Sequence, residues 1–172
     1  MGIFMELEFE ELLTPDSLQE LRKVALKVWP RTFAEILSQK QIEYMMQMMY
    51  APQVLTEELS NGVHFELLRI DREPAGYISY SAYLQEPGTA KLHKVYLLPE
   101  FHSQGIGQQM LDHAQKQCCK LGFKTVMLCV NKHNERAIKA YKRNGFVIEK
   151  ALCTPIGEGF YMDDYIMKKG LV

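Results

Sequence analysis

Two glycines separated by one residue lie where a predicted strand passes into a predicted helix. The strand, Lys94–Leu98, is rich in β-branched and aromatic residues, and an apolar repeat with helical spacing begins at Ile106. The first amides of a helix have no intrahelical partner and lie at the positive end of its dipole. Gly105 and Gly107 lack the side chains that would obstruct a close ligand. The segment therefore predicts a phosphate cradle made of backbone amides.

Two well-known classes of glycine loop fit this segment poorly. A dinucleotide-binding fingerprint needs a third glycine and an acidic residue at the end of the next strand, but this chain has Met110 and Asn131 at those positions. A P-loop needs Gly-Lys-Ser/Thr, but Gly107 is followed by two glutamines. The loop is thus not expected to hold a dinucleotide or a nucleoside triphosphate.

A second set of residues follows the next predicted strand and enters another predicted helix. Its members are Asn131, Asn134, Ala137, Tyr141, Gly145 and Phe146. Ala137 and Tyr141 are four residues apart and lie on one helix face. Asn134 is a good N-cap, and Gly145 suits the end of a helix.

The two motifs together resemble the signatures of the GCN5-related N-acetyltransferase (GNAT) family. His102-x-x-Gly105-x-Gly107 is similar to the family's loop, although the family usually has Gln or Arg where this chain has His102. The resemblance implies an α/β (α+β) single-domain GNAT fold over residues 1–172, with a mixed, mostly antiparallel central sheet and helices on both faces. It also implies acetyl-CoA-dependent transfer of an acetyl group to a primary amine by direct attack on the thioester.

The resemblance also assigns the residues expected to bind acetyl-CoA. The loop that would cradle the pyrophosphate comprises His102, Ser103, Gln104, Gly105, Ile106, Gly107 and Gln108. Backbone groups of Val95, Tyr96 and Leu97 would pair with the pantetheine arm. Further cofactor contacts are expected at Asn131, Asn134, Ala137 and Lys142. Lys142 and its basic neighbours either approach the 3′-phosphate or form a solvated face, and no metal is expected.

Tyr141 and His93 are the candidate catalytic residues. The family places a tyrosine hydroxyl near the sulfur, and a phenol with a pKa near 10 stays protonated at neutral pH. Tyr141 is thus expected to protonate the departing thiolate, the alternative being a core tyrosine. His93 lies on the strand before the loop and titrates in the range that suits a base. A packed or surface histidine is the alternative.

The acceptor is predicted less directly. The Trp29–Phe33 segment, Gly159–Met162 and Tyr165–Lys169 look like bacterial acetyltransferases of the PaiA type, which act on spermidine and spermine. A long cation calls for acidic residues, and those available are Glu35, Glu43, Glu86, Asp163 and Asp164. The Trp29–Phe33 segment is either packed in the core or a wall of the acceptor pocket. The methionine-rich helix that follows is either core or a lid.

Composition argues against nucleic-acid-binding, membrane-spanning and zinc-binding proteins. A net charge of −1 does not favour nucleic acid, no apolar run reaches membrane-spanning length, and the four cysteines lack zinc spacing. The expected location is the cytoplasm, and the expected partner is a small amine or peptide acceptor. A non-catalytic acyl-CoA sensor or interaction module remains the alternative function. The apolar C-terminal strand offers an edge for a homodimer.

Element boundaries follow from the same patterns. Strands are predicted over residues 4–9, 63–70, 75–84, 91–98, 125–130, 146–152 and 160–167. Helices are predicted from Thr14 to a stop at Pro30, over 39–49, over 105–120 and from Asn134 to Gly145.

Overall fold

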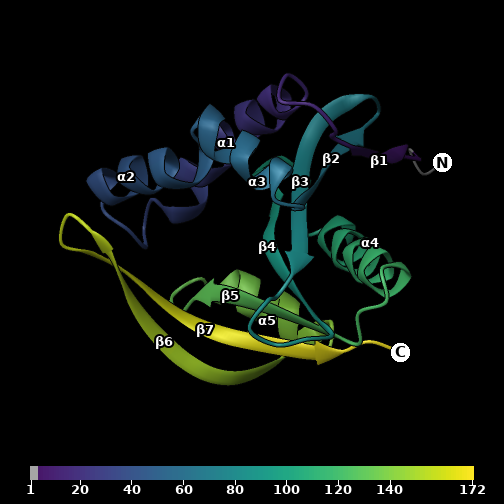
Figure 1. Cartoon of the computed structure of the whole chain (residues 1–172). Helices are drawn as coiled ribbons and strands as arrows, with labels where there is room; N and C mark the ends of the chain where they lie inside the picture. The colour runs from purple at the N-terminus through teal and green to yellow at the C-terminus, as the bar shows by residue number, and fades with distance from the viewer. Residues whose placement is uncertain (1–3) are drawn as a thin grey trace. The chain divides into compact units, whose positions relative to one another are not determined.

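The computed structural model describes residues 4–172 (Figure 1). The strands are β1 Leu7–Glu11, β2 His64–Ile70, β3 Glu73–Ala82, β4 Thr89–Leu97, β5 Thr125–Asn131, β6 Val147–Gly157 and β7 Phe160–Gly170. The helices are α1 Leu18–Phe33, α2 Gln39–Tyr50, α3 Pro52–Ser60, α4 Ile106–Lys120 and α5 Glu135–Arg143, with a short 3₁₀ turn at Pro99–Phe101.

The strands form one seven-stranded sheet in the order β1-β2-β3-β4-β5-β7-β6. Strands β1 and β2, β5 and β7, and β6 and β7 pair antiparallel, whereas β4 and β5 are parallel. The predicted class, a mixed and mostly antiparallel sheet with helices, is confirmed. Strand β7 follows β6 in the chain but lies between β5 and β6 in the sheet. The prediction that the C-terminal strand offers an edge for a homodimer was therefore wrong, because β6 forms that edge.

The chain forms two compact units, and strands β3 and β4 run through both. The first unit contains the described part of Met1–Ser79 together with Lys94–Ile106. In it α1, α2 and α3 contact one another, and α1 also contacts β2. The helix faces that meet are apolar, and their side chains Leu21, Ala25 and Leu55 are fully buried. Burial of these side chains is what holds the three helices together.

The second unit contains Tyr80–His93 and Gly107–Val172. Its strands β6 and β7 form a long curved hairpin (Figure 1). The predicted apolar face of α4 is buried, and it includes Met110, Ala114 and Cys118. Side-chain hydrogen bonds join α4 to the end of α5, because Asn144 donates to Asp112 Oδ1 at 2.9 Å.

Two helix predictions were wrong. Pro30 does not end α1, which continues to Phe33 with Pro30 inside it. The missing N–H bond is tolerated because Trp29 and Phe33 are both buried and their ring centroids lie 4.4 Å apart. Helix α3 was not predicted, although Pro52 occupies a first-turn position that suits proline and Leu55 is buried. The Ser38 cap of α2 is confirmed, because its side chain accepts from Gln41 N at 3.1 Å.

Two hairpins are tighter than predicted. The turn between β2 and β3 consists of Asp71 and Arg72 alone, which have φ angles of +50° and +73°. The turn between β6 and β7 is Glu158-Gly159, so β6 continues through Pro155 to Gly157. Proline is tolerated there because β6 is the edge strand of the sheet.

Candidate functional site

The glycine loop turns sharply just before α4 begins. Ser103 has a φ of +61° and Gly105 a φ of +78°, and the helix starts at Ile106. A Cβ placed on Gly105 would meet no atom within 4 Å, so its outer side is open. The positive φ explains the glycine at position 105. The loop therefore exposes the unpaired amides at the start of α4 toward open space.

Gly107 has no explanation inside the protein. Its φ lies outside the left-handed region, and a Cβ placed there would also meet nothing within 4 Å. Glycine near the start of a helix costs up to about 1 kcal/mol relative to alanine. Since none of the described residues requires glycine here, the position suits a ligand that approaches the start of the helix closely.

Side chains beside the loop bind the chain's own backbone. His102 Nε2 lies 3.0 Å from the Leu97 carbonyl oxygen and donates to it. Gln104 Nε2 donates to the Glu100 carbonyl oxygen at 3.2 Å. These contacts hold the loop in place, and they leave the backbone amides at its open side available to a ligand. Ser103 is exposed, and it contributes to the loop through its backbone conformation of positive φ.

The end of β4 carries the predicted pantetheine-binding residues. Val95 and Tyr96 are half-buried, and Leu97 is buried. The ring of Tyr96 packs on Tyr77, with centroids 5.4 Å apart, and on Trp29 at 6.0 Å. These contacts anchor this stretch of β4 to the core of the first unit. Its backbone is thus held in a fixed extended conformation.

Trp29 and Phe33 belong to a buried aromatic cluster. Trp29 Nε1 donates to the Tyr50 hydroxyl at 2.9 Å, and that hydroxyl lies 2.7 Å from the Tyr77 hydroxyl. Burial raises the pKa of both tyrosines well above the usual value, so both stay protonated. Trp29 is 2% exposed. Of the two interpretations of the Trp29–Phe33 segment, the structure supports packing in the core.

The second motif builds the turn between β5 and α5. Asn131 Oδ1 accepts from His133 N at 2.9 Å, and Asn134 Oδ1 accepts from Ala137 N at 3.4 Å. Asn134 is thus the N-cap of α5, as predicted. Ala137 is half-buried in the first turn. The spacing of this motif has a local structural cause besides any contact with a cofactor.

Sequence reasoning missed how α4 and α5 are locked together. Gln108 Nε2 donates to the Ala140 carbonyl oxygen at 3.0 Å, and Gln108 Oε1 accepts from Asn144 Nδ2 at 2.9 Å. Gln115 Nε2 also donates to Asn144 Oδ1, at 2.6 Å. The first turn of α4 is therefore tied to the helix that carries Tyr141. Polar residues at these spacings are ordinary on helix surfaces, so no sequence signal marked them.

Tyr141 lies in the last part of α5. Its ring contacts Phe146, with centroids 5.9 Å apart. Burial raises its pKa to about 12. Within residues 4–172 its hydroxyl has no hydrogen-bond partner. The group is thus a protonated phenol held by packing alone, which leaves its proton available to a ligand.

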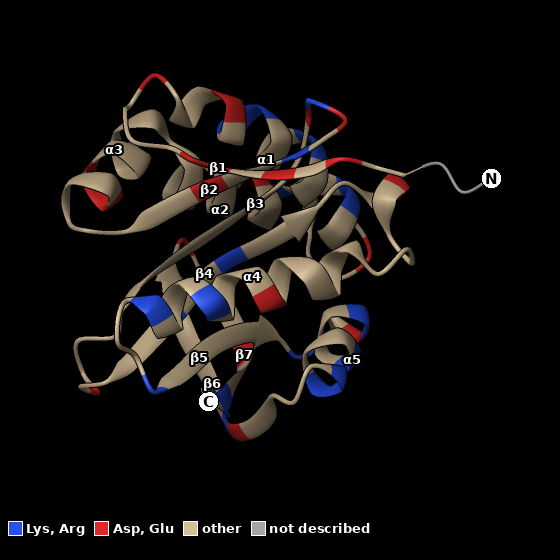
Figure 2. Ribbon diagram, turned by 90° about the vertical axis from the view of Figure 1, so that its right-hand side faces the viewer, with Lys and Arg blue, Asp and Glu red and all other residues tan. Residues whose placement is uncertain are grey.

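Lys142 lies on the exposed side of α5 together with other basic residues. In the ribbon of Figure 2, much of this helix is coloured blue for Lys and Arg. Its basic residues are the exposed Arg136, Lys139, Lys142 and Arg143. Such a face suits a phosphate group and also suits solvent, so both interpretations of Lys142 stand.

His93 lies near the end of the second unit's part of β4. Its Nε2 atom lies 2.7 Å from the Ser81 hydroxyl oxygen, on the neighbouring strand β3. The side chain is half-buried. A histidine held by a hydroxyl has a defined ring orientation, which a base requires.

The five acidic residues considered for the acceptor differ in their surroundings. Glu35 and Glu43 are exposed in the first unit. Glu86 accepts from Lys168 Nζ at 2.6 Å, and Asp163 pairs with Lys132 at 2.8 Å. Asp164 alone is buried, at 9% exposure. Burial, followed by the neighbouring Asp163 carboxylate, raises the pKa of Asp164 to about 6.

Residues 4–172 contain neither a candidate metal-binding cluster nor a candidate membrane-spanning helix. His, Cys, Asp and Glu side chains in this range form no group of three or more that could hold a metal ion. No helix in it combines the length and apolar character needed to cross a bilayer.

Comparisons with known proteins agree with these features. The profile of the acetyltransferase (GNAT) family matches residues 19–146. A spermidine N(1)-acetyltransferase of Thermoplasma acidophilum is 29% identical over 150 residues, which is 84% of this chain and 91% of the relative. The crystal structure of a PaiA N-acetyltransferase from Thermoplasma acidophilum, in complex with coenzyme A, superimposes with a TM-score of 0.80. It is 28% identical, with 96% of this chain and 99% of the other covered.

The fold extends to more distant proteins. A GCN5-related N-acetyltransferase from Rhodopseudomonas palustris superimposes with a TM-score of 0.80 at 14% identity, over 99% of this chain and all of the other. At that identity the likeness concerns the fold alone. The family profile covers more than half of the chain and includes the glycine loop and Tyr141. The chain therefore belongs to the acetyltransferase (GNAT) family.

Proposed function

We propose that this protein transfers the acetyl group of acetyl-CoA to the nitrogen of a primary amine by direct attack on the thioester. The observation that carries the proposal is the Tyr141 phenol, which has a pKa of about 12 and no hydrogen-bond partner in residues 4–172. Such a group stays protonated at neutral pH, so it can donate a hydrogen bond to the sulfur while negative charge develops on the departing thiolate. Donation of this kind to a leaving group is general acid catalysis.

The other residues of the two motifs hold the substrates. Acetyl-CoA supplies the activated acetyl group. The amides from Gln104 to Gln108 would bind the pyrophosphate, and Asn134, Ala137 and Lys142 would contact other parts of the cofactor. The backbone of Val95–Leu97 would bind the pantetheine arm and donate one hydrogen bond to the thioester oxygen. A well-placed donor of that kind lowers a barrier by about 3 kcal/mol. His93 would accept the amine proton.

We further propose that the acceptor is a polyamine such as spermidine. The support is the likeness to a spermidine N(1)-acetyltransferase over 84% of the chain. A second support is the presence of a buried carboxylate, Asp164, that no lysine or arginine neutralises by direct contact. A cationic amine is the kind of substrate that such a group recognises.

A binding module for acyl-CoA is the other candidate function. It would use the glycine loop and the basic face of α5, but it would have no use for a proton donor. The state of Tyr141 therefore favours an enzyme.

The test is thiol release from acetyl-CoA with a panel of amines, comparing the wild type with Tyr141→Phe. We expect turnover to fall by about 100-fold or more, while the acetyl-CoA dissociation constant from calorimetry stays the same. Tyr161→Phe, which changes an exposed tyrosine on β7, is the matched control and should behave as the wild type. Equal turnover in Tyr141→Phe would remove the proposed acid. Tight acetyl-CoA binding with no release for any amine would favour the binding module.

A further inference from the structure

Asp164 occupies the middle of the sheet in the second unit. On β7 it lies directly opposite Asn131 of β5 and opposite Leu152 of β6. The residue is 9% exposed. Within residues 4–172 its carboxylate makes no hydrogen bond or ion pair. Its oxygens still reach solvent, because Ser79 Oγ alone among the described side-chain nitrogens and oxygens is both fully buried and without a hydrogen bond. A carboxylate that is largely desolvated and has no partner carries an energetic cost, so its presence calls for an explanation.

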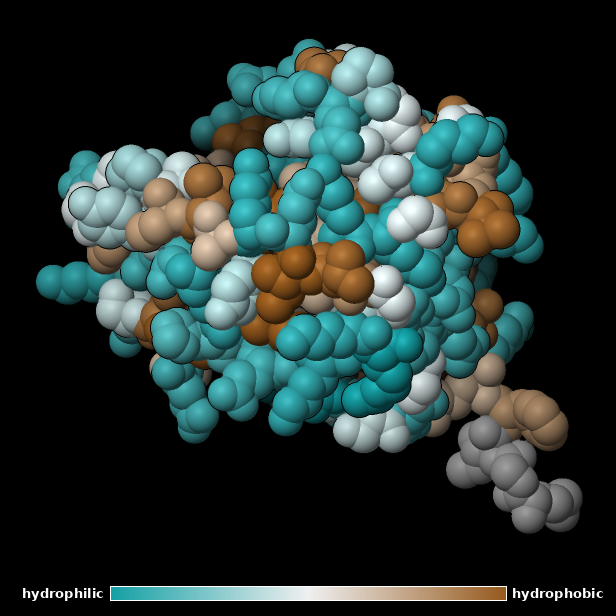
Figure 3. All heavy atoms as spheres, turned by 90° about the horizontal axis from the view of Figure 1, so that it is seen from below, coloured by the Kyte–Doolittle hydropathy of each residue, from teal (hydrophilic) through white to brown (hydrophobic). Residues whose placement is uncertain are grey.

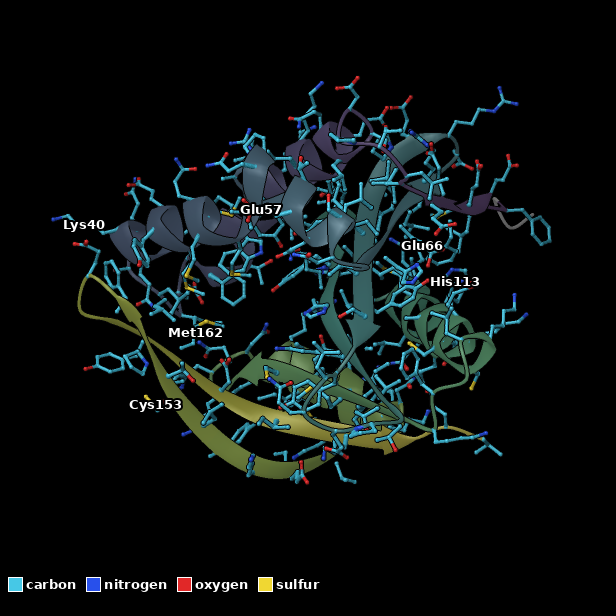
Figure 4. All side chains as sticks on the ribbon, viewed as in Figure 1. Lys40, Glu57, Glu66, His113, Cys153 and Met162 are labelled. Atoms are coloured by element: carbon cyan, nitrogen blue, oxygen red, sulfur yellow. The ribbon has the colours of Figure 1, made fainter. Side chains whose placement is uncertain are left out.

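The face of the sheet that carries Asp164 is the one opposite α5. Lys169, which also lies on β7, donates from Nζ to the carbonyl oxygen of Asn144 at the end of α5, at 2.6 Å. Lys169 lies five positions after Asp164 in a regular ladder, and an odd spacing places the two side chains on opposite faces. Met162 shares the parity of Asp164, and Figure 4 shows it on the other side of the hairpin from Cys153.

The same face carries the proposed base. Asn131 lies opposite Asp164, so Cys129 and Met127 share that face, and Met127 pairs with Lys91 of β4. His93 follows Lys91 by two residues and therefore faces the same way. The pairing of β4 with β5 in this unit ends at Leu92–Leu128, one pair short of His93 and Cys129. Asp164 and His93 thus lie on one face, near the end of that ladder.

The charged and titratable neighbours do not neutralise Asp164. The lysines whose charge reaches it are Lys91 and Lys132, and neither contacts it. Lys132 is already paired with Asp163, at 2.8 Å. Asp163 itself repels a negative charge on Asp164, and the Cys129 thiol, whose pKa is raised by burial, contributes no positive charge. The surroundings leave room for one more positive charge.

We propose that Asp164 binds an ammonium group of the acceptor, and that the acceptor is therefore an amine with at least two charged nitrogens. This inference rests on the proposed acetyltransferase function and adds the residue that selects the substrate. One nitrogen is acetylated, and a second, still protonated, donates its hydrogen bonds to Asp164. An ammonium both supplies the missing charge and satisfies the carboxylate oxygens, which an uncharged alkyl chain cannot do.

The test compares Asp164→Asn with Asp163→Asn at pH 7.5. The two variants remove the same charge from adjacent residues of β7 that face opposite ways. For spermidine we expect Asp164→Asn to raise KM by about tenfold or more, the usual effect of losing a charged hydrogen bond. Its kcat and its KM for acetyl-CoA should change by less than about threefold. In Asp163→Asn, kcat and the KM values for both spermidine and acetyl-CoA should also change by less than about threefold. An unchanged spermidine KM in Asp164→Asn would overturn the proposal.

A second arm uses pH and substrate charge. Below about pH 6 Asp164 is protonated, so the wild-type KM for spermidine should rise as the pH falls through 6, and in Asp164→Asn it should not. Butylamine, which has one nitrogen, should be acetylated with a similar KM by both proteins. Parallel pH profiles, or an equal loss for butylamine, would assign Asp164 a purely structural role.

Two further measurements distinguish three outcomes: a misfolded variant, a protein that is not an acetyltransferase, and an Asp164 that does not bind the amine. Ionised Asp164 opposes folding above its unfolded pKa, so Asp164→Asn should unfold at the same temperature as the wild type or a higher one at pH 7.5. Calorimetric titration of spermidine into the protein with coenzyme A needs no turnover. Loss of spermidine binding in Asp164→Asn would support the inference even if no acetyl transfer occurs. An active wild type with an unaffected Asp164→Asn would overturn this inference alone.

Discussion

Lys94 is a buried cation in the first unit, and its surroundings explain how the chain accommodates it. The side chain is 4% exposed, and its Nζ atom lies 3.5 Å from Glu58 Oε2. The same atom lies 5.3 Å from the centroid of the Tyr50 ring and 5.9 Å from that of Phe65. Aromatic faces attract a desolvated cation by about 1–2 kcal/mol. Lys94 directly precedes Val95, so its placement also fixes the start of the proposed pantetheine-binding stretch.

Removing the Glu58 carboxylate should therefore cost more than removing the Lys94 ammonium. We expect Glu58→Gln to lower the free energy of unfolding by about 2 kcal/mol, because the buried ammonium loses a neighbouring carboxylate charge. Lys94→Met keeps the length of the side chain without its charge and should cost less. Urea unfolding measures both, and Glu57→Gln, an exposed change on the same helix (Figure 4), is the control. A larger loss in Lys94→Met than in Glu58→Gln would contradict this account.

At the scale of elements, Gly107 in the first turn of α4 lowers the stability of the helix but leaves open space beside it. Gly107→Ala replaces a poor helix former with the best one where no atom of the protein obstructs a Cβ. We expect the melting temperature to rise. If the loop binds the pyrophosphate as proposed, the affinity for acetyl-CoA should fall about tenfold or more, because the new methyl group would occupy the space of that group. Thermal denaturation and calorimetry measure the two effects. Gln109→Ala, an exposed change two residues later, should leave the affinity unchanged. An unaltered affinity in Gly107→Ala would place the cofactor elsewhere.

The elements differ in how well their sequences predicted them. The two motifs specified the strand, loop and helix boundaries around Gly105 and Asn134 because glycine and N-cap residues act locally. Pro30 was misjudged because aromatic packing inside α1 offsets a lost hydrogen bond, and packing is not local information. Asp164 was one acidic residue among several in the sequence. Only strand register, which pairs it with Asn131 and buries it, distinguishes it from Asp163.

At the scale of the whole molecule, the sheet ends in two differently protected edges. Strand β1 carries Glu8, Glu10 and Glu11 on one edge. Strand β6, at the other edge, is exposed along nearly its whole length and combines apolar Val147 and Ile148 with Lys150. Figure 3 shows a brown apolar patch bordered by teal side chains on the face seen from below. Charges and proline on an edge strand oppose pairing with a second sheet.

Removing the charge of Lys150 from the edge strand β6 should promote self-association of the protein. We expect Lys150→Ile to associate with increasing protein concentration, because it extends the apolar residues along an unpaired edge. Light scattering and size-exclusion chromatography measure this association. Lys124→Ile removes the same charge from an exposed turn outside the strands and should not associate more than the wild type. Equal association of the two variants would show that the charge on β6 does not prevent self-association.

The place of β7 in the sheet has a consequence for biosynthesis. The ribosome makes β5 and β6 first, yet the strand that lies between them is made last. While the nascent chain is still being extended, β5 and β6 have no intervening partner, and exposed strands are prone to wrong pairing. A stop codon before Phe160 would therefore remove far more than a tail, because it would leave β6 without its only neighbour in the sheet. Native structure in this unit should thus form only after β7 has been synthesised and has left the ribosome.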